Sequence, residues 1–242
     1  MANGTDTKTI AIVGVGPGLG ASLARRFARE GFAVALLARR AESLEPVSAE
    51  LRQTGARVLA LPTDGTQPAQ VLSAFSRIKA ELGAPDVLVY NAGNFFRGGI
   101  LELTPQQFVQ AWEANCLGAF LAAQQVLPDM VARKAGTILL TGATGSLRGG
   151  ARFACLAVGK FGLRALGQSM AREFGPQGVH VAHVVVDGQI DNPRTQARYP
   201  EGRTADSYLS ADAIADIYWD LHAQHPTTWT HELDLRPYGE KF

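Results

Sequence analysis

The sequence predicts an α/β fold: a single doubly wound Rossmann-type domain in which a seven-stranded parallel sheet is flanked by helices. Three observations support it. Short apolar runs alternate with helical patterns along the chain, and a glycine-rich turn follows the first run. The chain's 242 residues are also enough for one large α/β domain. We therefore expect residues 1–242 to form one domain.

Seven segments are predicted strands. Most are short, continuous apolar runs, as expected for parallel strands that are buried on both faces of a sheet. The last instead alternates apolar and polar residues. In chain order the predicted strands are 9–13, 32–37, 57–61, 86–90, 137–141, 180–186 and 229–235.

Helical patterns connect these strands. Thr104, Pro105 and Gln107 predict a helix start, with threonine as the N-cap, proline at the first helical position and glutamine at the third. The helix that begins there runs to about residue 133, with a bend near Pro128. The predicted helices are 21–31, 41–54, 67–82, 104–133, 149–174 and 210–222.

The glycine-rich turn lies between the first strand and the first helix. Glycines let the backbone adopt positive φ and approach a ligand closely, and the N–H groups at the start of a helix favour a phosphate. The turn therefore favours a dinucleotide-phosphate site, and an ordinary tight turn between strand and helix is the alternative. Its candidate binding residues are Gly14, Gly16, Pro17, Gly18, Leu19 and Gly20.

Further candidates follow the next strands, whose carboxyl ends meet at one edge of the sheet. Arg39 stands where an acid would bind the ribose of NAD, and a guanidinium there favours the 2′-phosphate of NADP(H) over NAD(H). An ordinary solvated arginine is the alternative. Asp64 and Gly65 suit an adenine amino group, although aspartate is also common in turns. The small residues at 91–93 (Asn91, Ala92 and Gly93) would let a cofactor lie against the backbone.

Together with Asn115 and Lys160, these residues resemble the short-chain dehydrogenase/reductase family over about residues 8–235. The resemblance implies that the glycine turn binds pyrophosphate, that Asp64 contacts adenine and that Lys160 binds the nicotinamide ribose. It also implies that the loop with Gly188 and Ile190 contacts the carboxamide. A small-molecule substrate is implied too, with a homodimer or homotetramer built around the helices at 104–132 and 150–174.

The sequence departs from this family where the proton is transferred. The family places a tyrosine four residues before the lysine and a serine about 13 residues before the tyrosine. Here those positions hold Leu156 and Ala143, and neither side chain can donate a proton. Thr144 and Ser146 offer hydroxyls nearby. The loop after the sixth strand also has Asp187 where the family usually has proline.

Few polar residues remain as candidates for catalysis. Asn115 and Lys160 match the family by position, and Lys160 would serve as an acid if burial lowered its pKa; otherwise it only holds the ribose. Residues 191–209 form the one long irregular insertion and are interpreted as a substrate lid. Tyr199 and Tyr208 lie in it. His183, inside a buried strand, is interpreted as a core histidine with satisfied hydrogen bonds.

Two functions fit this pattern. One is an NADP(H)-dependent oxidoreductase of carbonyl or alcohol substrates with an altered proton donor. The other is a catalytically inactive NADP(H)-binding protein with a role in sensing or assembly. A net charge of +1 favours neither nucleic acid nor a membrane surface as a partner. The two cysteines have no metal-binding spacing, and the polar start of the chain does not resemble a signal peptide, so we expect a cytoplasmic protein without a metal.

Overall fold

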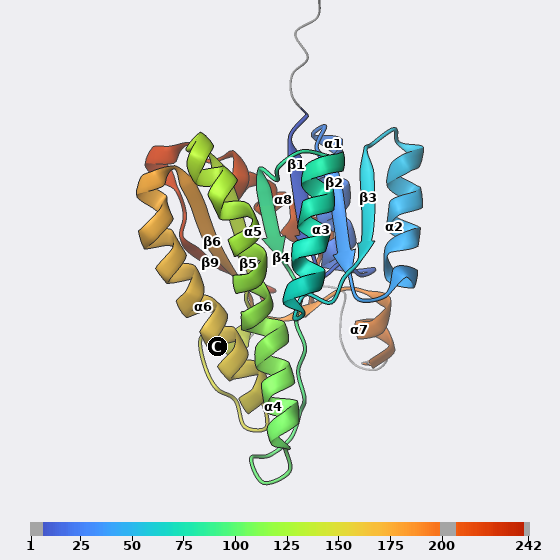
Figure 1. Cartoon of the computed structure of the whole chain (residues 1–242). Coiled ribbons are helices and arrows are strands. Elements are labelled where there is room, and N and C mark those ends of the chain that lie inside the picture. The colour runs from blue at the N-terminus through green and yellow to red at the C-terminus, as the bar shows by residue number, and fades with distance from the viewer. Residues whose placement is uncertain (1–6, 199–206, 240–242) are drawn as a thin grey trace, which may run out of the picture.

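A seven-stranded sheet forms the centre of the computed structural model, which describes residues 7–198 and 207–239. The strand order is β3-β2-β1-β4-β5-β6-β9, and all neighbouring strands are parallel (Figure 1). The predicted fold class is therefore confirmed. The strands are β1 (Thr9–Val13), β2 (Ala33–Ala38), β3 (Val58–Pro62), β4 (Val87–Tyr90), β5 (Gly136–Thr141), β6 (Val179–Val186) and β9 (Glu232–Leu235).

Helices cover both faces of the sheet. One apolar core packs α1, α2 and α8 against it, and a second packs α3, α5 and α6 on the opposite face. Figure 1 shows α3, α5 and α6 in front of the sheet. The helices are α1 (Leu19–Arg29), α2 (Ala41–Gln53), α3 (Pro68–Glu81), α4 (Pro105–Trp112), α5 (Gly118–Arg133), α6 (Ala154–Phe174), α7 (Pro193–Arg198) and α8 (Ala211–Ala223).

The predicted helix at 104–133 is continuous but not uniform. Thr104 accepts a hydrogen bond from the Gln107 backbone, and the capping box is complete, as predicted. Between α4 and α5, however, Glu113–Leu117 form a π-helical segment that contains the buried Asn115. Such wider turns are frequent at functional sites.

The helix predicted from residue 149 begins instead at Ala154. The reason is local backbone conformation. Arg152 has a φ of 68°, in the left-handed region, and Phe153 is not helical. Residues 149–153 therefore form a loop beside the carboxyl edge of the sheet.

The segment predicted as a lid is partly regular. It contains α7, and β8 (Tyr208–Leu209) pairs in parallel with β7 (Gln189–Ile190) in a separate two-stranded sheet. Tyr199 lies outside the described residues. None of the described helices is long and apolar enough to cross a membrane.

The chain order reverses between β1 and β4, because β2 and β3 extend the sheet on one side and β4 starts the other. Open parallel sheets bind ligands beyond the carboxyl ends of their strands at such a reversal. The fold therefore places the glycine-rich turn after β1 beside the loop after β4.

Candidate functional site

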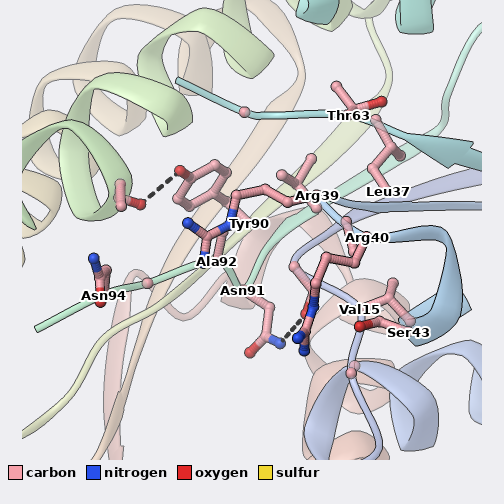
Figure 2. Close-up of a pocket in the computed structure, with 18 of the residues that line it drawn as sticks. Val15, Leu37, Arg39, Arg40, Ser43, Thr63, Tyr90, Asn91, Ala92 and Asn94 are labelled. Carbon is pink, nitrogen blue, oxygen red and sulfur yellow. Dashed lines mark hydrogen bonds between the residues drawn. The ribbon is translucent and has the colours of Figure 1, made fainter. Parts of the chain in front are cut away.

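A cavity of about 710 Å³ lies at this reversal. Residues that follow β1, β2, β3 and β4 line it, together with a few from the turn before α5 and from the segment after β7 (Figure 2). The structure thus brings together most of the sequence-predicted cofactor residues. Those that line the cavity are Gly14, Gly16, Pro17, Gly18, Leu19, Gly20, Arg39, Asp64, Gly65, Asn91, Ala92, Gly93 and Ile190.

The glycines of the turn have different reasons to be glycine. Gly14 has a φ of +99°, and a Cβ there would lie 2.3 Å from the Ala92 nitrogen. A Cβ on Gly20 would lie 2.7 Å from the Val15 Cα. A Cβ on Gly16 would meet nothing within 4 Å, so this glycine leaves the cavity open to a ligand. Asn91 fixes the turn by donating from Nδ2 to the Gly14 carbonyl at 2.8 Å.

The start of α1 completes the phosphate-binding features of this cavity. Gly18 is its N-cap, so no side chain caps the first turn, and no acidic residue lies in that turn. The free N–H groups and the positive end of the helix dipole favour an anion there. The residues present therefore fit the pyrophosphate of a dinucleotide.

Two guanidinium groups flank the other end of the cavity. Arg39 and Arg40 both line it, together with Ser43 (Figure 2). Within the described part of the chain, no carboxylate lies within ion-pair distance of either arginine. This end fits a phosphate better than a bare ribose. Asp64 also lines the cavity, but its Oδ1 accepts hydrogen bonds from the Thr66 backbone and hydroxyl, so it forms a turn as well.

Asn115 and Lys160 do not line the cavity; they lie behind Gly93. A Cβ on Gly93 would lie 2.9 Å from Asn115 Oδ1 and 3.6 Å from Lys160 Nζ. Asn115 Nδ2 donates to the Asn94 and Ala111 carbonyls, while its buried Oδ1 has no partner among the described residues.

Lys160 is buried and donates one hydrogen bond, at 2.7 Å, to the Thr141 carbonyl. Burial lowers the pKa of its ammonium to about 8. Two of its three N–H donors have no protein partner among the hydrogen bonds of the described chain. These donors suit the hydroxyls of a ribose.

The hydroxyls near the family's serine position differ in accessibility. Thr144 is half-buried and donates to Asp187 Oδ1, whereas Ser146 is completely buried and its Oγ accepts from the Ala143 backbone at 3.2 Å. Neither residue lines the cavity, and neither does Leu156. Gly188 also lies outside the cavity wall, where a Cβ would be 2.9 Å from Pro237 Cδ.

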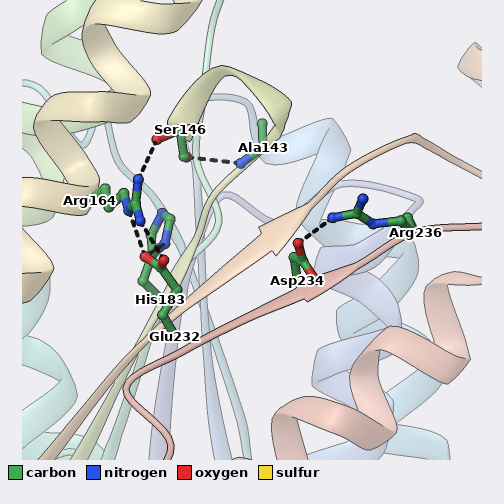
Figure 3. Close-up of polar contacts among 7 residues, drawn as sticks. All are labelled: Ala143, Ser146, Arg164, His183, Glu232, Asp234 and Arg236. Atoms are coloured by element: carbon green, nitrogen blue, oxygen red, sulfur yellow. Dashed lines mark hydrogen bonds and ion pairs between the residues drawn. The ribbon is translucent and has the colours of Figure 1, made fainter. Parts of the chain in front are cut away.

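A partly buried ionic array lies beneath the turn after β5 (Figure 3). Arg164 donates two hydrogen bonds of 2.7 Å to Glu232, and His183 Nδ1 lies 3.2 Å from the same carboxylate. Burial lowers the pKa of His183 to about 4, so the ring is neutral at neutral pH.

The interpretation of His183 as a satisfied core histidine holds for only one of its ring nitrogens. Its Nε2 has no partner among the described residues. A Cβ on Gly142 would lie 2.5 Å from that atom, so the ring fills the space beside the glycine. Sequence reasoning missed the array because His183 and Glu232 meet only through the register of β6 and β9.

Comparisons with known proteins agree with this geometry. The family model described as short chain dehydrogenase matches residues 8–201. Oxidoreductase UcpA of Escherichia coli is 31% identical over 211 residues, which cover 86% of this chain and 80% of that protein. The crystal structure of a short-chain dehydrogenase from Rhodopseudomonas palustris is 36% identical, with a TM-score of 0.82 and coverage of 96% and 99%. The structure of an alcohol dehydrogenase from Thermococcus sibiricus, complexed with 5-hydroxy-NADP, is 26% identical, with a TM-score of 0.87 and coverage of 97% and 98%.

Proposed function

Since this chain belongs to the short-chain dehydrogenase/reductase family of oxidoreductases, we propose that it is an NADP(H)-dependent oxidoreductase acting on a small carbonyl or alcohol substrate. One observation carries the proposal. The cavity combines an uncapped helix start at Gly18 with two arginines that have no carboxylate partner in the described chain. These features suit the pyrophosphate and the 2′-phosphate of NADP(H), respectively.

Individual residues have separate roles in this proposal. The turn from Gly14 to Gly20 and the α1 start hold the pyrophosphate, Arg39 holds the 2′-phosphate, and Asp64 faces adenine. Lys160 donates to the nicotinamide ribose, with Asn115 beside it behind Gly93. The bound cofactor supplies the hydride chemistry, and the protein binds and orients the substrate. The segment at 191–209, whose Asn192 and Thr195 line the cavity, covers the substrate as a lid.

A second function has a specific observation in its favour. Leu156 and Ala143 remove the family's tyrosine and serine, and Ser146 is too buried to replace the latter. A protein that kept the cofactor cavity and lost the proton-transferring residues would bind NADP(H) without turnover. Its role would then be in sensing NADP(H) or in assembly.

A panel of substrates separates the two functions. We expect NADPH consumption, or NADP⁺ reduction in the other direction, with at least one compound among small ketones, aldehydes, quinones, imines and secondary alcohols. The matched control is the double variant Ala143→Ser, Leu156→Tyr, which restores the family's pair. The oxidoreductase proposal fails if the wild-type protein binds NADPH and turns over nothing in the panel while the double variant is active.

A further inference from the structure

The proposed function requires a group that exchanges a proton with the substrate. Resting on that function, we propose that Thr144 is this group and that Asp187 is the base that takes the proton from Thr144. Both residues lie where the sequence departs from its family. Thr144 is next to Ala143, which stands at the serine position, and Asp187 stands where the family usually has proline.

The geometry of two adjacent strands brings the pair together. Thr144 begins the single turn of 3₁₀ helix (Thr144–Ser146) that follows β5, and Asp187 directly follows β6, the parallel neighbour of β5. The Thr144 hydroxyl donates to Asp187 Oδ1. Asp187 is only 4% exposed, whereas Thr144 is half-buried. Thr144 is therefore the more accessible residue of the pair, although it lies outside the wall of the cofactor cavity, and the proposal places the substrate against its hydroxyl.

Other nearby groups are less suitable. Ser146 is completely buried. Tyr90 donates to the Ala114 carbonyl at 2.8 Å, and burial raises the pKa of its phenol. Lys160 lies behind Gly93 and faces the Thr141 carbonyl. Thr66, which follows β3, also donates from a half-buried hydroxyl to a carboxylate, but its partner Asp64 belongs to the turn proposed to face adenine. Thr144 is the half-buried hydroxyl with a carboxylate partner in the described turn after β5.

Two guanidinium groups lie close to Asp187. Arg148, from the loop after β5, lies 4.0 Å from Oδ2, and Arg236, which follows β9, lies 3.9 Å from the same oxygen. Arg236 also pairs with Asp234 of β9 (Figure 3). Asp187 thus contacts one hydroxyl and lies within 4.0 Å of two guanidinium groups. In the proposal its Oδ1 accepts the proton through Thr144.

The balanced step is the oxidation of an alcohol. The substrate O–H bond breaks and its proton goes to Thr144 Oγ1, while the proton of Thr144 goes to Asp187 Oδ1. The hydride leaves the carbinol carbon for the oxidised nicotinamide cofactor of the proposed function, and a carbonyl forms. Reduction reverses these transfers.

Variants of both residues test the pair with 1-phenylethanol and cyclohexanol as probes and NADP⁺ as the oxidant. We expect Thr144→Val and Asp187→Asn each to lower kcat at least about 100-fold, the range typical of positioned acid–base groups. Thr144→Ser keeps the hydroxyl and is expected to stay within about threefold of wild type, as general acid–base catalysis requires. Added formate is expected to raise the kcat of Asp187→Ala at least about tenfold, because it replaces the missing base.

Asp234→Asn is the matched control, because Asp234 shares the Arg236 partner but does not contact Thr144. NADPH affinity by fluorescence titration and the thermal midpoint are measured for every variant. The proposed role of the pair is wrong if Asp187→Asn retains more than a third of wild-type kcat, or if Asp234→Asn loses as much kcat as Asp187→Asn. It is also wrong if formate does not raise the kcat of Asp187→Ala. A wild-type protein that binds NADPH and oxidises or reduces no compound overturns the proposed function and the pair together.

Discussion

We propose that Arg39 decides the choice between the two nicotinamide cofactors. It lines the cavity with Arg40, without a carboxylate partner in the described chain. Charge-assisted hydrogen bonds contribute roughly 1.5–3 kcal/mol, so we expect Arg39→Ala to weaken NADPH binding at least about tenfold and to leave NADH binding nearly unchanged. Calorimetric titration with both cofactors measures this. The control is Arg52→Ala, an exposed arginine on α2, and an equal loss for both cofactors would contradict the role of Arg39.

Lys160 illustrates a conflict between stability and its proposed role in cofactor binding. Its pKa falls to about 8 in the folded state from 10.5, because burial penalises the charge. Below pH 8 the ammonium is charged in both states, and the folded state carries the full cost of burying it. That cost disappears as the pH rises from 8 to 10.5, so stability rises over this window.

We therefore expect Lys160→Met to stabilise the protein at pH 7 by about 1–3 kcal/mol and to weaken NADPH binding. Urea unfolding at pH 7 and pH 9.5 measures the first effect, and the gain should be smaller at pH 9.5. A variant that is less stable than wild type at pH 7 would show that the hydrogen bond to the Thr141 carbonyl outweighs the buried charge.

Much of the site could be predicted at the residue scale, and the rest depended on contacts between distant strands. The turn from Gly14 to Gly20 and the residues that follow β2, β3 and β4 were found because a parallel sheet collects its strand ends at one edge. The pairing of Thr144 with Asp187 was not predicted, although both residues had been noted, because it depends on the register of β5 and β6. Burial, which separates Thr144 from Ser146, was equally invisible in the sequence.

At the scale of elements, the strands were predicted more accurately than the helix starts. The seven predicted strands match the seven strands of the sheet to within three residues at each end. Most of them are continuous apolar runs, because burial on both faces leaves a strong signal. The start of α6 was wrong by five residues, since the left-handed conformation of Arg152 cannot be read from its residue type. The π-helical segment around Asn115 gave no signal either, as the apolar spacing continues across it.

The region formed by β6, α8 and β9 should lose stability in acid. Burial lowers the pKa of His183 and of His222 to about 4, and that of His180 is lowered too. The unfolded chain binds protons at these histidines near pH 6.5, so their contribution to stability is complete above 6.5 and is lost as the pH falls towards 4. Each fully coupled histidine adds up to about 1.4 kcal/mol per pH unit to this loss.

We expect the urea midpoint to fall steeply between pH 6.5 and pH 4.5, and His222→Gln to flatten the slope. Gln is chosen because it can keep a hydrogen bond to Thr137, which lies 2.9 Å from His222 Nδ1. The control is His225→Gln, an exposed histidine in the turn after α8. An unchanged slope in His222→Gln would contradict the assignment.

At the scale of the whole molecule, α4, α5 and α6 carry a group of exposed apolar side chains. Their exposed fractions lie between 38% and 47%, and apolar side chains that gather on a surface mark interaction sites. Figure 1 shows the three helices on the same side of the sheet. The group comprises Phe108, Val109, Trp112, Phe120, Val158 and Phe161.

These side chains support a homodimer or homotetramer, as the family resemblance implies. We expect size-exclusion chromatography with light scattering to give a mass of two or four chains, and Phe120→Glu with Phe161→Glu to give one chain. The matched control is Leu72→Glu on α3, an exposed leucine on a different helix. A wild-type protein that runs as a monomer at micromolar concentration would contradict the assembly.

A crystal structure with bound NADPH tests the central claim most directly, because it shows both the cofactor cavity and the groups around the reacting carbon. We predict the pyrophosphate at the start of α1 beside Gly18, the 2′-phosphate against Arg39 and Lys160 at the nicotinamide ribose. We also predict that Thr144 supplies the hydroxyl nearest to the nicotinamide C4. A cofactor bound elsewhere, a 2′-phosphate turned away from Arg39, or a different proton-donating side chain at C4 would contradict the account.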